Sequence, residues 1–102
     1  MKNIKSLIEY PKSGILSKHL VNTLAMDVTL FCEAKGSEMS EHTSSREAFI
    51  YFLEGSGIFY LRKKPIKIFP GLSIHMKKNM PHSLKIKKNT AFLLILTGEK
   101  SK

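Results

Sequence analysis

The sequence predicts an all-β barrel or sandwich built from short strands. Apolar and polar residues alternate with a period of two along much of the chain, as they do in half-buried strands. Turn-forming residues recur roughly every 6–10 residues, and no segment shows the pattern of a long amphipathic helix. A closed sheet also removes the exposed edges that would otherwise promote aggregation.

The first strands are predicted from alternation and from aromatic content. The clearest alternation covers residues 26–34 and places Cys32 on its more apolar face, which predicts a buried thiol. Residues 47–53 are rich in Phe, Ile and Tyr and run into Glu54-Gly55-Ser56-Gly57, which predicts a turn at 54–57.

The second half of the chain predicts hairpins. Residues 58–62 and 66–69 flank Lys63-Lys64-Pro65, a sequence typical of a hairpin tip. The same reasoning predicts a short strand and then a final pair joined by a turn at 87–89: 72–76, 83–86 and 91–96.

Length and composition predict one cytoplasmic domain. A chain of 102 residues is near the usual domain size, and 42% of them are apolar. No apolar run approaches the ~20 residues that a membrane span needs, and the N-terminus lacks the apolar stretch of a secretory signal. Cys32 is the only cysteine, so no internal disulfide is expected.

The chain is strongly basic, with a net charge of +9 from 17 Lys and Arg against 8 Asp and Glu. Such a charge raises the question of nucleic-acid or anion binding. However, the lysines fall mainly in predicted turns and in the tail, without the interleaved aromatic residues on which bases stack. Nucleic acid is therefore the least favoured partner, and a lysine-rich surface explains the charge.

Two histidine-bearing segments give the strongest functional signal. His42 follows Gly36 and lies in Glu-His-Thr-Ser, ahead of a strand that ends at Gly55. The second segment begins at Gly71, passes through a short apolar strand and ends at Pro81-His82. If the two segments lie on facing strands, His42 and His82 point into one barrel.

This order of motifs resembles the cupin family. The first cupin motif is a glycine, five residues, His-x-His, three or four residues, a glutamate, six residues and a glycine; the second runs from a glycine to a Pro-His pair. The resemblance covers about residues 15–97 and implies a cupin-type double-stranded β-helix barrel, jelly-roll-like, with little or no helix. It implies that residues 1–102 form a single cupin domain, and small cupins commonly form homodimers.

The chain departs from the cupin metal site. In metal-binding cupins three His and one Glu hold Fe, Mn, Ni, Zn or Cu, and here only His42 and His82 match. The second His position holds Ser44, the glutamate position holds Ala48, and Glu47 is displaced by one residue. On a regular strand Glu47 points away from His42, so only a bulge would bring it into the site.

The resulting prediction is a ligand pocket in the barrel around these residues: His42, Ser44, Glu47, Met76 and His82. If a divalent transition metal binds, His42 and His82 are the ligands, completed by Glu47, His75 or water. The alternative for the two imidazoles is a hydrogen-bonded pair without a ligand. Arg46 is predicted to form a salt bridge or an interface contact, with anion binding as the alternative.

The function predicted from these residues is that of a small intracellular cupin that binds a small molecule in its barrel. One alternative, implied by the resemblance, is a metal-dependent enzyme of the dioxygenase or isomerase type. Without a metal, either histidine could act as a general base, because its unperturbed pKa lies near neutral pH. The further alternative is a ligand-sensing module without catalysis.

Overall fold

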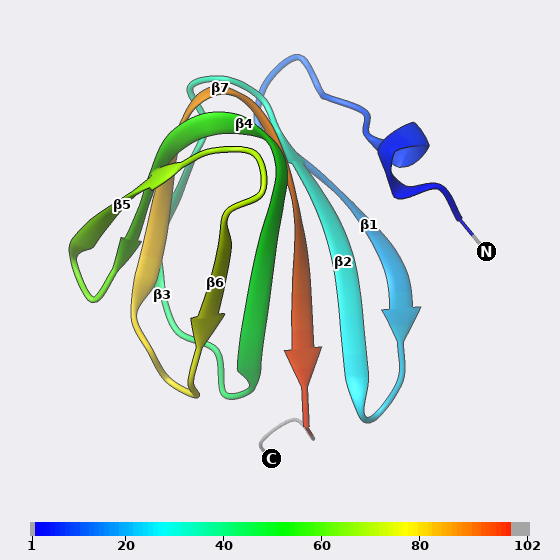
Figure 1. The fold of residues 1–102 in the computed structure, drawn as a ribbon, viewed down its shortest axis with the longest axis vertical. Coiled ribbons are helices and arrows are strands. Elements are labelled where there is room, and N and C mark those ends of the chain that lie inside the picture. The colour runs from blue at the N-terminus through cyan, green and yellow to red at the C-terminus, as the bar shows by residue number, and fades with distance from the viewer. Residues whose placement is uncertain (1, 99–102) are drawn as a thin grey trace.

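The computed structural model describes residues 2–98, which form one sheet of seven antiparallel strands folded over on itself (Figure 1). A 3-10 helix, η1 (Ile4–Leu7), is the only helix in residues 2–98, and no helix of the described part is long and apolar enough to cross a bilayer. The strands, in chain order, are β1 (Ile15–Asn22), β2 (Met26–Glu33), β3 (Glu38–His42), β4 (Glu47–Leu61), β5 (Lys64–Ile68), β6 (Ser73–Met76) and β7 (His82–Thr97). The all-β prediction is confirmed.

Two long bent strands, β4 and β7, organise the sheet. They pair along their whole length and arch together over one end of the molecule, so that the sheet forms two facing walls (Figure 1). The first wall carries β1, β2 and β6 with the adjoining halves of β4 and β7. The second wall carries β3, β5 and the other two halves.

The turns predicted at 54–57 and 87–89 are wrong, because both strands continue through these positions. The ladder instead shifts register between Phe52 and Gly57, and these bulges bend the strands. Gly55 adopts a φ of +120°, and a Cβ there would lie 2.5 Å from the Thr90 Cα. A glycine-rich segment thus marks a bend at which two backbones approach closely, not a reversal of the chain.

The hairpin tip between β4 and β5 lies one residue earlier than predicted. Arg62 and Lys63 both have positive φ, at 49° and 67°, as the tight turn of a two-residue hairpin requires. Pro65 therefore lies within β5, where it is tolerated because β5 is an edge strand.

The core fills the space between the two walls. Its aromatic centre is Phe52, whose ring lies 5.2 Å from that of Phe92 and 6.4 Å from that of Phe59 on the second wall. The buried apolar residues of this interior are Ala48, Ile50, Phe52, Phe59, Ile68, Ile74, Met76, Leu84, Ile86 and Phe92.

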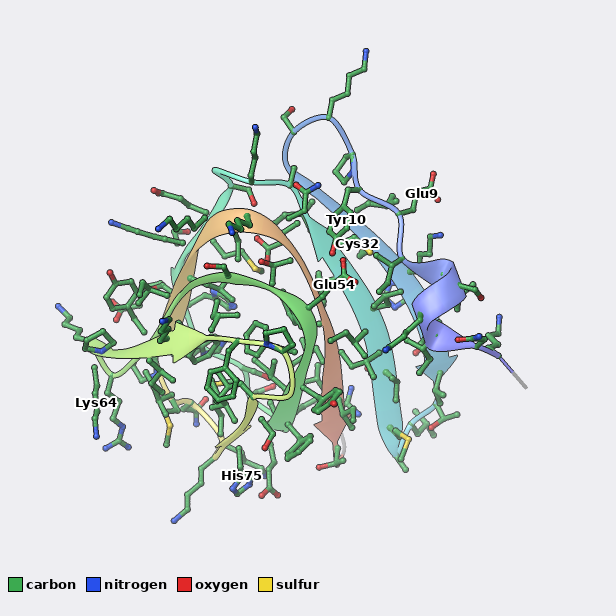
Figure 2. All side chains as sticks on the ribbon, turned by 45° about the horizontal axis from the view of Figure 1, so that its top comes forward. Glu9, Tyr10, Cys32, Glu54, Lys64 and His75 are labelled. Carbon is green, nitrogen blue, oxygen red and sulfur yellow. The ribbon has the colours of Figure 1, made fainter. Side chains whose placement is uncertain are left out.

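A second, smaller cluster lies on the outside of the first wall. It is covered by the N-terminal segment, residues 2–14, which precedes β1. Cys32 is 0% exposed there, as the alternation predicted. The Tyr10 hydroxyl donates a 2.7 Å hydrogen bond to Glu54 Oε2, which fixes the segment over the cluster. Figure 2 shows Tyr10 of this segment close to Cys32 and Glu54, well away from His75. The thiol is therefore a packing group.

Candidate functional site

The structure brings His42 and His82 together from β3 and β7. Their Cα atoms are partners in the ladder, and their ring centroids lie 4.2 Å apart at an interplanar angle of 62°. The ladder runs from the Met39–Leu84 pair to the His42–His82 pair, so β3 has one more residue than β7 over this interval. This bulge places His42 opposite His82, where regular alternation would place Glu41.

Backbone carbonyl groups orient both imidazoles in the same way. The Nδ1 atom of His42 lies 2.8 Å from the Ser40 carbonyl oxygen, and that of His82 lies 2.8 Å from the Met80 carbonyl oxygen. A carbonyl oxygen only accepts, so each Nδ1 must donate, and each neutral ring then has an unprotonated Nε2. Both rings thus offer the same atom as a hydrogen-bond acceptor, a base or a ligand.

His82 is held neutral by its surroundings. Its side chain is 8% exposed, and its ring stacks on Phe59 at a centroid distance of 5.9 Å. Burial lowers the pKa of His82 below 6.5, and the neighbouring His42 lowers it further, against the opposing effect of the Met80 carbonyl. The Nε2 lone pair of His82 is therefore present at neutral pH.

A small apolar cavity adjoins the imidazole pair. Its volume of about 30 Å³ is room for roughly two water molecules. Apart from the two imidazoles its lining is apolar: Phe31, Met39, Ile50, Phe59, Leu84, Phe92 and Leu94. A ligand would place only its end in this space, or would displace side chains to enter further.

Ser44 and Met76 lie close to this region but outside the cavity lining. The Ser44 Oγ accepts a hydrogen bond from the Arg46 backbone N–H at 3.1 Å, and its carbonyl accepts one from the Asn79 N–H at 2.7 Å. The second bond ties the loop after His42 to the loop before His82. Met76 is buried in the interior cluster on β6.

Glu47 lies on the outer face of β4, away from His42. Its carboxylate makes a 2.5 Å hydrogen bond with His75 Nε2, and both side chains are about half exposed. This is the direction that regular strand alternation gives, and no bulge turns Glu47 inward. Figure 2 shows His75 at the lower edge of the molecule.

Comparison with known proteins agrees with this geometry. The cupin-domain family model matches residues 29–98. The chain belongs to the cupin family. No protein with curated annotation matches the sequence.

Several solved cupin-like structures are similar to this chain. A conserved protein of unknown function from Streptococcus pyogenes has 22% identity and a TM-score of 0.87, over 99% of this chain and 89% of that one. A cupin 2 conserved barrel domain protein from Leptotrichia buccalis has 30% identity and a TM-score of 0.87, over 94% of this chain and 47% of that one. Salicylate 1,2-dioxygenase from Pseudoaminobacter salicylatoxidans, an enzyme, has 13% identity and a TM-score of 0.77, over 92% of this chain and 28% of that one.

The side chains of this cupin do not fit a tight metal site. Metal-binding cupins offer four protein ligands, whereas His42 and His82 offer two nitrogen atoms. Within residues 2–98 no group of three or more His, Cys, Asp or Glu side chains is placed to hold an ion. Zinc ordinarily takes at least three protein ligands, so two imidazoles supply at most a weak site.

Arg46 is more deeply buried than the sequence analysis recognised. Its side chain is 3% exposed, and its Nη1 pairs with Asp27 at the start of β2. The salt bridge is thus with a residue nineteen positions away in the sequence. The alternating pattern could have predicted this burial. Arg46 directly precedes β4 and shares a face with Ala48 and Ile50, which are buried.

Glu33 is a buried acid that the sequence analysis did not single out. It is 0% exposed in the interior at the end of β2, and one of its oxygens accepts a 3.4 Å hydrogen bond from the Ser37 hydroxyl. Burial raises its pKa to about 7, against the opposing effect of Ser37. Glu33 shares a face of β2 with Phe31, which lines the cavity. The more polar face of β2 is therefore the one that faces the interior.

Proposed function

We propose that this cupin binds a small molecule at the open end of its barrel, with the Nε2 atoms of His42 and His82 as the polar contacts. The observation that carries the proposal is the pairing of two imidazoles from distant strands, each locked by a carbonyl into the same tautomer. A ligand group that donates a hydrogen bond, such as a hydroxyl or an amine, suits two adjacent acceptors.

The same arrangement supports binding with or without catalysis. His82 is neutral and desolvated, so its Nε2 could accept a proton from a bound ligand as a general base. A sensor that only binds would use the same contacts. Consumption of a bound ligand, followed by chromatography, separates the two functions. The metal-dependent dioxygenase or isomerase alternative requires further donors beside the imidazole pair.

Protein-observed NMR tests this site directly. We expect fragments with hydrogen-bond donors to shift the Cε1–H signals of His42 and His82 saturably, because they bind at Nε2. His42→Ala should weaken these fragments about tenfold, through loss of one acceptor. The matched control is His75→Ala on the outer face, which should leave their affinity unchanged. If no fragment shifts either imidazole, or if His75→Ala weakens binding equally, the proposal is wrong.

Metal content gives a separate prediction. Protein purified without a His tag should hold less than about a tenth of an equivalent of Fe, Mn, Ni, Zn or Cu, because two donors bind weakly. Elemental analysis before and after soaking and desalting measures this. A full equivalent retained after desalting would contradict the prediction and would revive the metal-dependent alternative.

Homodimer formation also stays a proposal for this cupin. Two aromatic side chains on the outer face of the first wall, Phe49 and Tyr51, are partly exposed, as they would be at a subunit contact. Sedimentation equilibrium at several concentrations distinguishes an 11.6 kDa monomer from a dimer.

A further inference from the structure

We propose that Arg46 anchors a carboxylate group of the ligand, an inference that rests on the proposed function for the other end of the same molecule. Arg46 is 3% exposed, and Asp27 occupies only its Nη1 atom. Its Nε and Nη2 atoms are buried and donate to no atom of residues 2–98. Buried donors without an acceptor are rare in proteins, because desolvating them is costly.

The two unpaired nitrogens define the chemistry of the group they would bind. The Nε–H and Nη2–H bonds of a guanidinium are nearly parallel and form one side-on edge. A carboxylate presents two coplanar oxygens at matching spacing, which gives two charge-assisted hydrogen bonds. Asp27 leaves this buried edge without a hydrogen-bond partner, so Arg46 can hold a second carboxylate there while it keeps its salt bridge, provided that the covering side chains move aside.

Arg46 lies at the same end of the barrel as the imidazole pair. His42 ends β3, and Arg46 follows after a loop of three residues. The Ser44 carbonyl in this loop accepts a hydrogen bond from Asn79, in the loop that leads to His82. His82 begins β7 opposite the end of β4, and Arg46 directly precedes β4 opposite the end of β7, so both lie at the strand ends remote from the bend.

The side chain of Arg46 crosses the inner face of the first wall just below the cavity. It reaches from the start of β4 to Asp27 on β2, and β7 lies between these two strands. Asp27 is paired with Leu96, whereas the next inward-facing residue of β7, Leu94, already lines the cavity. The guanidinium therefore lies one row of side chains from the cavity.

These positions define a ligand class. The molecule is a small carboxylic acid with a short apolar body and a hydrogen-bond donor remote from the carboxylate. To reach both ends the ligand displaces the row of side chains between Arg46 and the cavity. Its carboxylate then binds the edge of Arg46, its body covers the apolar lining, and its donor reaches Nε2 of His42 or His82. A guanidinium edge pairs with carboxylate and with phosphate, but a buried edge favours the smaller, planar carboxylate.

Arginine side-chain NMR provides the test, because the sequence contains only two arginines, Arg46 and the exposed Arg62. We expect acetate and benzoate to shift the Nε–H signal of Arg46 saturably, at constant ionic strength, and to leave that of Arg62 in place. Benzamide, the uncharged match of benzoate, should shift neither. Arg46→Lys keeps the positive charge but loses the edge, and should weaken benzoate on the order of tenfold, with Arg62→Lys as the control.

Each outcome separates this inference from the proposed function. An Arg46 signal that acetate and benzoate leave in place, or that benzamide shifts equally, overturns the inference, and the buried donors are then satisfied by water. Fragments that shift the imidazoles in that case leave the proposed function standing. A response at Arg46 to the carboxylates, together with imidazoles that stay silent toward the donor-bearing fragments, supports the anion site and contradicts the proposed function. If inorganic phosphate, added in the same titration, shifts the Arg46 signal and the carboxylates do not, the ligand is not a carboxylate.

Discussion

Replacing Gly55 by alanine should destabilise the fold by about 3 kcal/mol or more. Gly55 has a φ of +120°, and an added Cβ would lie 2.1 Å from the Thr90 Oγ1 and 2.5 Å from the Thr90 Cα. The second atom is backbone, so no side-chain rotation relieves the overlap. For a domain of this size the melting temperature should fall by at least about 12 °C, as circular dichroism would measure.

The matched control is Gly36→Ala, which isolates the effect of close packing. Gly36 also has a positive φ, of +83°, but an added Cβ would meet no atom within 4 Å. Its substitution should therefore cost only the backbone strain, about 1–2 kcal/mol. Equal losses of stability in the two variants would show that only backbone strain acts at Gly55. They would contradict the close packing of β4 against β7 at Thr90.

The contact at Gly55 matters for the candidate site because it holds the two walls at their bend. Thr90 accepts a 3.1 Å hydrogen bond from the Ser56 N–H and donates one of 2.7 Å to the Lys88 carbonyl. These bonds fix β4 and β7 where both change direction. The second wall, which carries His82, is thereby set against the first wall, which carries Arg46.

The all-β class was predictable because period-two alternation is a local signal. The sequence did not predict that β4 and β7 continue through 54–57 and 87–89. Segments such as Gly-Ser-Gly and Lys-Lys-Asn occur both in turns that reverse the chain and in bulged bends within a strand. Which of the two forms is decided by the partner strand, and the register of that strand is not visible in a short window.

The approach of His42 to His82 was predictable from the order of the two motifs, but the direction of His42 was not. That direction depends on the bulge in β3, which nothing in the neighbouring residues announces. Arg46 and Glu33 show the same limit. The alternating pattern indicates which residues of one strand share a face. It does not indicate whether a buried charged side chain finds a hydrogen-bond partner, because that partner comes from strands distant in the sequence.

Glu33 should make this cupin less stable as the pH rises from about 4.5 to about 7. Its pKa is raised from 4.5 to about 7 by burial, so the folded state holds the proton more tightly than the unfolded chain does. The stabilisation is complete below the unfolded pKa and is lost as the pH passes through the folded one. A shift of this size corresponds to about 3 kcal/mol.

Glu33→Gln removes this dependence, because an amide stays neutral at every pH. Urea unfolding at about pH 5 should give similar stabilities for the two proteins, whereas at about pH 8 the variant should be more stable by up to about 3 kcal/mol. His82 acts in the opposite sense, since its lowered pKa favours folding as the pH rises toward 6.5. Because His82 is present in both proteins, its effect cancels in the difference. The exposed Glu41→Gln variant controls for loss of a surface charge and should follow the wild type. A constant difference between Glu33→Gln and the wild type across this range would mean that Glu33 is already ionised in the folded barrel at low pH.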